Sequence, residues 1–287
     1  MFSRKTTGSV VCPACGSLVG VRDDRCYMCG RVNPGLWGFA PLLRRLGTDF
    51  GFAPFVIGAS GILYGLTLLA SGSQLTVMGG GLSILAPSAT ALFLFGASGA
   101  VPVFIAGSWW TVLSATWLHG SFLHILFNML WVRDLAPATA DVIGPARTVV
   151  IYVVAGVCGF LLSSIAGQYL GWLPIPLLHG ARLTIGASAS IFGLLGALVH
   201  YGRTSGSSLI HAEAKRYAVI LFVFGLVMPG VDNYAHAGGF LGGYAMSAFF
   251  NPMTRERGDH MLMAAVCLVL TFFAIVLSVV RGVSFLS

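Results

Sequence analysis

The chain has 287 residues, 56% of them hydrophobic and 9% charged, and its mean hydropathy is +0.87. Because an ordinary soluble domain is about 25% charged, this composition excludes a soluble domain and indicates a polytopic membrane protein. The formal net charge of +7 could indicate a nucleic-acid partner. Basic residues in membrane proteins usually mark cytoplasmic loops, however, so their positions along the chain must distinguish the two interpretations.

The first fifty residues are polar and contain four cysteines but no long apolar run. A signal peptide would place an apolar core directly after its early basic residues, and none follows Arg4 and Lys5. We therefore expect the amino terminus to stay in the cytoplasm.

Two CxxC pairs lie in the stretch "CPACGSLVGVRDDRCYMCG", ten residues apart and each followed by glycine. Their cysteines are Cys12, Cys15, Cys26 and Cys29. Four thiolates in two such knuckles suit a tetrahedral Zn2+, and the glycines permit tight turns that aim backbone N–H groups at sulfur. Disulfides are the alternative, which a reducing cytoplasm disfavours.

The sequence therefore predicts a cytoplasmic zinc-ribbon-like module over residues 1–34, followed by a connector over 35–51. A segment this small cannot bury a sufficient core, so structural Zn2+ would supply most of its folding free energy. Three roles are open to the module: contact with a cytoplasmic protein partner, regulation, or anchoring. The basic, partly amphipathic connector can lie on the inner leaflet of the membrane.

Seven apolar segments follow, each long enough or nearly so to cross about 30 Å of hydrocarbon at about 1.5 Å per residue. We expect them at 52–71, 109–132, 148–170, 186–201, 216–230, 232–250 and 261–281. The segment 72–108 is uncharged and apolar but interrupted by glycine and proline, so it predicts a loop in or on one face of the membrane.

The basic residues support this topology. With the amino terminus inside, only Arg182 and Arg281 of the sixteen Lys and Arg residues fall on the outside. This strong positive-inside bias supports both the number of spans and the orientation, and it removes the need for a nucleic-acid partner.

Burying polar and ionisable side chains inside a membrane span costs free energy, so their presence suggests a functional role. They occur in "LHGSFLHILFNML", "IGASASIFGLLGA" and "DNYAHAGGFLGGYA". In this topology Ser188 and His236 each lie within about four residues of the outer end of their spans, hence at one depth, roughly 5 Å below the boundary. His236 is therefore a candidate base for a Ser188 nucleophile.

An acyl-transfer site also needs donors for an oxyanion. His124 and Asn128 are four residues apart on one helix face and could supply side-chain donors. The start of the fourth span, at Ala187 and Ser188, offers backbone N–H groups that have no partner in the first helical turn.

Small residues would let the fourth and sixth spans approach closely. Gly239 and Gly243 form a GxxxG face on the sixth span. Small residues at the same spacing lie on the fourth span at Ala189, Gly193 and Ala197. Ser190 points to another face of its helix, and we interpret it as a packing residue.

Together, "HGSFLHILFN", "GASASIFGLLGA" and "AHAGGFLGG" make the chain resemble the rhomboid intramembrane serine proteases over roughly residues 50–250. The resemblance implies an all-α polytopic membrane bundle, with a six-span catalytic core over 52–250. Residues 251–287 then form a loop and an additional seventh transmembrane helix. It also implies cleavage of transmembrane protein substrates within the lipid bilayer near its outer face, without a catalytic cofactor. The expected location is a bacterial inner membrane.

The resemblance implies a Ser-His dyad in which Ser188 is the nucleophile and His236 the general base. His124 and Asn128 would stabilise the oxyanion together with the backbone at Ala187 and Ser188. The supporting residues that it implies are His119, Gly186, Phe192, Gly239 and Gly243. Among these, His119 would be structural, Gly186 would begin the GxSx turn, and Phe192 would stack on the catalytic histidine.

Two positions depart from the family pattern. The first loop of the family often carries a Trp-Arg pair, whereas Trp110 here is followed by Thr111. The residue after the nucleophile is Ala189 where glycine is more usual. Asp232 lies one helical turn before His236 and could complete a triad, but at the start of a helix an N-cap role is the preferred interpretation.

Two other functions are considered. A catalytically inactive rhomboid-like adaptor that binds membrane proteins would lack the nucleophile or the base, and this sequence has both. A metal transporter using His119, His124 and His236 would require carboxylates or more histidines at mid-membrane depth, and none of the nine Asp and Glu residues lies in the middle of a predicted span.

Overall fold

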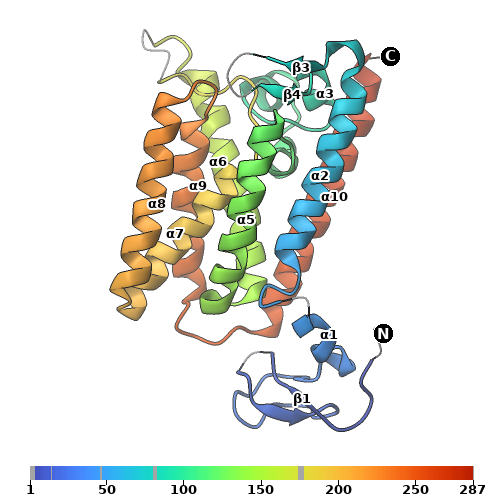
Figure 1. The fold of residues 1–287 in the computed structure, drawn as a ribbon, viewed down its shortest axis with the longest axis vertical. Helices are drawn as coiled ribbons and strands as arrows, with labels where there is room; N and C mark the ends of the chain where they lie inside the picture. The colour runs from blue at the N-terminus through green and yellow to red at the C-terminus, as the bar shows by residue number, and fades with distance from the viewer. Residues whose placement is uncertain (1–3, 14, 46, 80–82, 174–177, 287) are drawn as a thin grey trace.

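The computed structural model describes residues 4–13, 15–45, 47–79, 83–173 and 178–286. These residues form a bundle of long helices with a small β-containing module at one end, which we call the module end (Figure 1). The long helices are α2 (Phe52–Ser71), α5 (Phe122–Ile143), α6 (Pro145–Tyr169), α7 (Ser188–Ser205), α8 (Ser208–Val227), α9 (Asn233–Phe250) and α10 (Gly258–Leu286). The predicted fold class, an all-α polytopic bundle, is confirmed.

Within the described residues, three helices (α2, α6 and α10) are long and apolar enough by themselves to cross a membrane. Other long helices carry polar or charged residues that lower their hydropathy, such as Glu213 and Lys215 in α8. These apolar helices indicate a membrane protein, and α6 among them is mostly buried inside the bundle.

The second predicted span, 109–132, is wrong in its bounds. A short helix α4 (Thr111–Ser114) and a single 3-10 turn η4 (Ala115–Trp117) occupy its first half, and α5 begins only at Phe122. The break has a local cause, because the Ser121 hydroxyl accepts a hydrogen bond from the His124 backbone N–H and caps α5. Hydropathy alone does not detect such a cap.

The fifth predicted span, 216–230, is also displaced. Helix α8 begins at Ser208, where Ser207 caps it, because charged residues continue the helix beyond its apolar part. It ends at Val227, before Pro229.

The segment 72–108 contains only short elements, as its glycines and prolines predict. The hairpin strands β3 (Thr76–Met78) and β4 (Ile84–Ala86) are followed by α3 (Ala89–Leu94) and a π-helical turn η3 (Val101–Ile105). All lie at the end of the bundle opposite the module (Figure 1).

The centre of the bundle is built from α6, α7 and α9. A Cβ atom on Gly239 of α9 would collide with the Ala189 carbonyl of α7, and a Cβ on Gly243 would collide with the Gly193 carbonyl. The predicted small-residue faces therefore do pack against each other, which brings the two backbones into direct contact.

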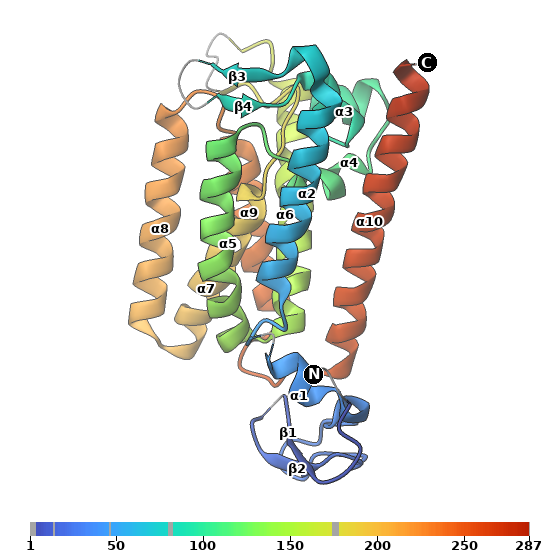
Figure 2. The ribbon, with the colours of Figure 1, turned by 45° about the vertical axis from the view of Figure 1, so that its right-hand side comes forward.

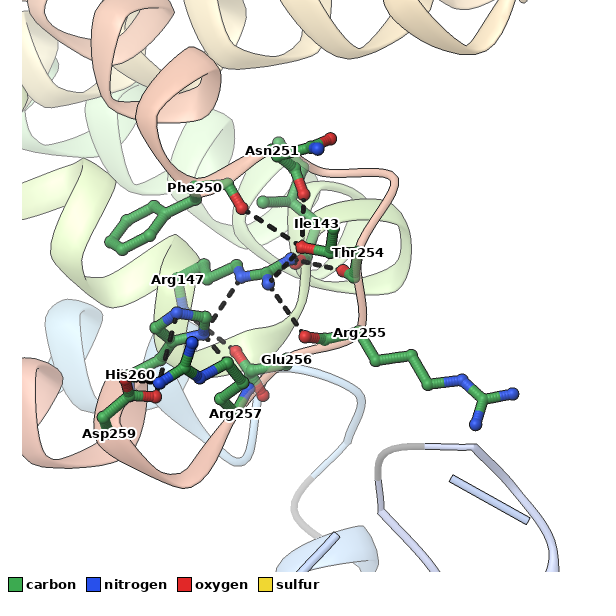
Figure 3. A network of polar contacts seen from close by, with 10 residues as sticks. All are labelled: Ile143, Arg147, Phe250, Asn251, Thr254, Arg255, Glu256, Arg257, Asp259 and His260. Atoms are coloured by element: carbon green, nitrogen blue, oxygen red, sulfur yellow. Dashed lines mark hydrogen bonds and ion pairs between the residues drawn. The ribbon is translucent and has the colours of Figure 1, made fainter. Parts of the chain in front are cut away.

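At the module end, a buried arginine ties the start of α6 to the segment that leads into α10 (Figure 3). The Arg147 side chain is 1% exposed. It donates to the Thr254 carbonyl (2.8 Å), the Arg255 carbonyl (2.9 Å) and Nδ1 of His260 (3.1 Å). The Glu256 carboxylate accepts from the Arg147 backbone N–H, and burial raises the pKa of this carboxyl.

The amino-terminal module pairs the antiparallel strands β1 (Ser9–Val11) and β2 (Leu18–Gly20). A short turn η1 (Leu36–Gly38) and helix α1 (Ala40–Arg45) follow. Leu36 and Ala40 share a buried cluster with Val10, so the first part of the predicted connector packs onto the module.

The module touches the core beside α10 (Figure 2). Nη2 of Arg31 lies 2.9 Å from Sδ of Met261, and Nη1 of Arg255 donates to the Met28 carbonyl at 3.0 Å.

Candidate active site

Ser188 is the first residue of α7 and follows a sharp turn at Gly186. Gly186 has a φ of +121°, which residues with a side chain rarely adopt, and a Cβ there would lie 2.7 Å from Nε2 of His124. The Gly186 N–H donates to the Ala115 carbonyl at 2.9 Å, which anchors the turn. Only glycine therefore fits at this position.

His236 lies in the first turn of α9 and is 6% exposed. Its imidazole stacks on the Phe192 ring, with centroids 4.2 Å apart and an interplanar angle of 17°. Phe192 is one helical turn after Ser188 and so lies on the same face of α7. The ring contact therefore sets His236 against the face of α7 that carries Ser188.

Two further contacts pack the first turn of α7 beside the first turn of α9. Ala189 and Ala235, which adjoin Ser188 and His236, belong to one buried cluster. A Cβ on Gly159 of α6 would lie 2.5 Å from the Ala235 carbonyl and 2.8 Å from Cβ of Ala189. The sequence analysis did not identify Gly159, although the small residues of "AGVCG" in α6 are a signal for it.

No hydrogen bond joins Ser188 to His236 among the described residues, and within them Nδ1 of His236 has no partner. Catalytic hydrogen bonds are often long in proteins without bound substrate and shorten when substrate binds. The roles of nucleophile and base therefore stay predictions.

Asp232 does not orient His236 in this structure. Its carboxylate accepts hydrogen bonds from the Ala235 backbone N–H (3.0 Å), the Thr184 hydroxyl (2.7 Å) and the Ser163 hydroxyl. The first of these is an N-cap of α9. The N-cap interpretation of Asp232 is confirmed.

His124 faces the turn before Ser188, as the short approach of its Nε2 to Gly186 shows. The Gly120 backbone N–H donates to Nδ1 of His124 at 3.3 Å. An acceptor at Nδ1 places the proton of the neutral imidazole on Nε2, so Nε2 is a donor directed at the turn. This arrangement suits an oxyanion donor.

Asn128 lies one turn further along the same face and is buried. Its amide nitrogen donates to the His124 carbonyl at 2.8 Å, which leaves a second N–H on that nitrogen. Ala187, the N-cap residue of α7, and Ser188 contribute backbone N–H groups that have no acceptor within the helix. The two backbone groups belong to the turn that His124 faces, and Asn128 adjoins His124 through its hydrogen bond.

His119 and Ser190 lie behind the site. The His119 ring is fully buried and contacts the His124 ring edge-on at 5.2 Å. Ser190 is also fully buried, and its hydroxyl faces α6, 2.7 Å from where a Cβ on Gly156 would lie. Ser190 is therefore directed away from His236.

The four amino-terminal cysteines form a second site. Every pair of their Sγ atoms lies within 4.8 Å, and they are the cluster of potential metal ligands found in the described part of the chain. The Cys12–Cys29 and Cys15–Cys26 sulfur pairs are 3.7 and 3.6 Å apart. A tetrahedron with Zn–S bonds of about 2.3 Å has sulfur atoms about 3.8 Å apart, so the donor set fits a tetrahedral ion.

Tight turns follow the two CxxC pairs, as predicted, although the glycine N–H groups are directed at carbonyls and not at sulfur. Gly16 and Gly30 have φ values of +76° and +71°, and their N–H groups donate to the Cys12 and Cys26 carbonyls. Burial opposes ionisation of Cys15, but hydrogen bonds from Ser17 and the other cysteines outweigh it and lower the pKa of this thiol to about 6. A lowered thiol pKa favours metal binding, because the thiolate is the ligand.

Comparison with known proteins identifies the part of the chain that holds the first site. Residues 106–253 match the family model of the Rhomboid domain. The chain is 29% identical over 168 residues to rhomboid protease GluP of Bacillus subtilis, covering 57% of this chain and 31% of that protein. It is 30% identical over 155 residues to the putative rhomboid protease YdcA of the same organism, covering 53% and 71%.

A plant relative is similar to the same degree. RHOMBOID-like protein 5 of Arabidopsis thaliana is 32% identical over 142 residues, covering 48% of this chain and 43% of that protein. The chain thus spans less than half of the length of this protein and of GluP. The matched region contains the Gly186 turn and His236 but not the four cysteines or α10.

Proposed function

Because the chain belongs to the rhomboid family, we propose that it is an intramembrane serine endopeptidase with Ser188 as nucleophile and His236 as general base. The observation that carries the proposal is the stacking of His236 on Phe192, one turn beyond Ser188 on the same face of α7. This contact supports placing the imidazole of His236 beside the first turn of α7, which directly follows the Gly186 turn.

The proposed reaction follows the chemistry of acyl transfer. Ser188 Oγ attacks the carbonyl carbon of the scissile peptide bond while His236 accepts the hydroxyl proton. The resulting oxyanion accepts hydrogen bonds from Nε2–H of His124, the Asn128 amide and the backbone N–H groups at Ala187 and Ser188.

The intermediate then collapses. The C–N bond breaks, His236 returns the proton to the leaving amine, and water activated by His236 hydrolyses the acyl-enzyme. A helical substrate hides its carbonyls in hydrogen bonds, so a transmembrane substrate must unwind locally to react.

The starts of α7 and α9 are the ends of these helices that point away from the module (Figure 1). With the amino terminus in the cytoplasm, the site opens toward the outer face of the membrane, and a bacterial inner membrane is the proposed location. The division into a module (1–34), a connector (35–51), a catalytic core (52–250) and a carboxy-terminal extension (251–287) belongs to the same proposal.

We also propose that the four cysteines hold a structural Zn2+, which fits their sulfur spacing. Large side chains are exposed on the module at Tyr27 and Met28, by 72% and 59%, and on the adjoining connector at Trp37, by 69%. Exposed apolar groups of this kind suit contact with a cytoplasmic protein partner.

The chain offers a matched pair of serines to test the enzymatic proposal. A fluorophosphonate probe should label the wild-type protein in membranes, and Ser188→Ala should abolish both labelling and cleavage of a single-span model substrate. Ser190→Ala should retain both, since the Ser190 hydroxyl has no partner among the described residues and its loss leaves no group unpaired.

His236→Ala should lose labelling as well, because no base would activate the serine. Undiminished labelling in Ser188→Ala would refute the proposed nucleophile. A wild-type protein that binds membrane proteins but neither labels nor cleaves would instead be the inactive adaptor.

A further inference from the structure

The half of α10 that lies far from the module packs against the segment 89–117 (Figure 2). Nε1 of Trp110 donates to Oγ of Ser278 at 3.1 Å, and the Arg281 guanidinium lies over the Trp110 ring, 5.2 Å from its centroid. One turn away, a Cβ on Gly282 would lie 2.5 Å from Cδ1 of Leu94. Trp110 is 8% exposed, and Ser278 and Arg281 of α10 contact it in two ways.

Trp110 is connected to the candidate active site by a short series of packed groups. It is the N-cap residue of α4. Val112 and Ala115, which follow it, share a buried cluster with Ala189 and Ala235, the neighbours of Ser188 and His236. Shifting Trp110 would therefore shift α4 against both catalytic helices.

The same segment also fixes the turn before Ser188 through backbone hydrogen bonds. The Ala115 carbonyl accepts from the Gly186 N–H at 2.9 Å. Ser98 and Thr184 exchange backbone hydrogen bonds of 3.0 and 2.8 Å. The chain on both sides of Trp110 thus supports the Gly186 turn.

We propose that Ser278 and Arg281 of α10 are positioning residues that hold Trp110 and, through α4, keep the Gly186–Ser188 turn in its reactive geometry. This role rests on the proposed function. Trp110 is followed by Thr111, so no neighbouring residue in the loop supplies a cation to the indole, and Arg281 supplies one from α10. Arg281 is itself exposed while Trp110 is buried, and a cation over a tryptophan face is attracted to it at exposed sites as well.

The kinetic test uses the full chain in membranes. Arg281→Ala should lower kcat about threefold to tenfold with KM nearly unchanged, because the turn is displaced while substrate contacts remain. Arg281→Lys should recover most of the loss, since an ammonium also binds the ring face. Arg257→Ala, which removes an exposed arginine just before α10, is the matched control and should match wild type.

A double-mutant cycle locates the effect at the tryptophan. If Arg281 acts through Trp110, the losses in Arg281→Ala and Trp110→Leu should not add in the double variant. Additive losses, or equal kcat values for Arg281→Ala and Arg257→Ala, would overturn the proposal.

Hydrogen exchange provides a readout that needs no catalysis. Amides of residues 111–117 and 184–189 should exchange faster in Arg281→Ala than in wild type and Arg257→Ala, whereas those of α8 should not change. Unchanged exchange would overturn the positioning role. If the wild-type protein neither labels nor cleaves, the proposed function fails, and exchange still decides whether α10 holds this segment.

Discussion

Ser188 and Ser190 are two residues apart on α7, so about 100° of rotation per residue turns their side chains roughly 200° apart. Ser188 shares its face with Phe192 and hence with the imidazole of His236. Ser190 instead faces Gly156 of α6. At the residue scale, the rotation of the helix alone thus separates the candidate nucleophile Ser188 from the packing residue Ser190.

The hydrogen bonds of a single residue, Asp232, decide whether its carboxylate is free to orient His236. The oxygens of Asp232 are bonded to the Ala235 N–H and to the hydroxyls of Thr184 and Ser163. The carboxylate therefore stabilises the start of α9 and connects it to α6. Asp232 thus acts on His236 indirectly, because it stabilises α9, the helix that carries this histidine.

We predict that Asp232→Asn changes kcat by less than about tenfold, because the amide oxygen can still cap α9. Replacing the acid of a working triad by its amide lowers kcat about 10⁴-fold. The measurement is kcat for the model substrate, with fluorophosphonate labelling as a second readout. A loss of the order of 10⁴ in a correctly folded variant would show that Asp232 orients the imidazole.

At the scale of elements, the contact between α7 and α9 depends on the absence of side chains. The carbonyls of Ala189 and Gly193 occupy the space that Cβ atoms on Gly239 and Gly243 would need. Because the obstacles are backbone atoms, a larger residue cannot be accommodated by a change of rotamer. The helices must separate, and the stacked His236 must move with α9.

Gly239→Ala should therefore destabilise the protein by about 1–3 kcal/mol and slow labelling of Ser188. The matched control is Gly65→Ala in α2, where a Cβ would meet no atom within 4 Å. That variant should be neutral or slightly more stable, since alanine is the better helix former. Thermal unfolding in detergent compares the two, and equal midpoints would contradict close packing of α7 on α9.

At the scale of the whole molecule, the two candidate sites lie at different ends. The four cysteines are in the module, whereas Ser188 and His236 are at the ends of α7 and α9 that point away from it (Figure 1). The module contacts the core through a few groups around Arg255 and Met261. Folding of the module and geometry of the active site should therefore be largely independent.

We predict that Cys26→Ser lowers bound zinc, which elemental analysis should find at about one ion per four-cysteine site in wild type. The variant module should become sensitive to protease while Ser188 labelling persists. Cys267→Ser, which changes a cysteine of α10, should keep both the metal and the protected module. Equal zinc content in Cys26→Ser and wild type would refute the metal site.

Features that depend on local spacing were predictable from the sequence. The helical bundle, the family and the cysteine turns are confirmed, and the turn at Gly186 lies where the GxSx pattern predicts it. The bounds of α5 and α8 were missed. Hydropathy reports where a chain prefers lipid, whereas the caps at Ser121 and Ser207 decide where a helix begins.

The sequence by itself determined which residues have the chemistry for a site, because residue type and spacing along a helix are properties of the chain alone. Only the tertiary structure decided which of their oxygen and nitrogen atoms already take part in hydrogen bonds or ring contacts. The hydrogen bond from Thr184 to Asp232 and the contact of Arg281 with the Trp110 ring each join segments far apart in sequence. Such contacts form only when the helices have packed, so no local pattern records them.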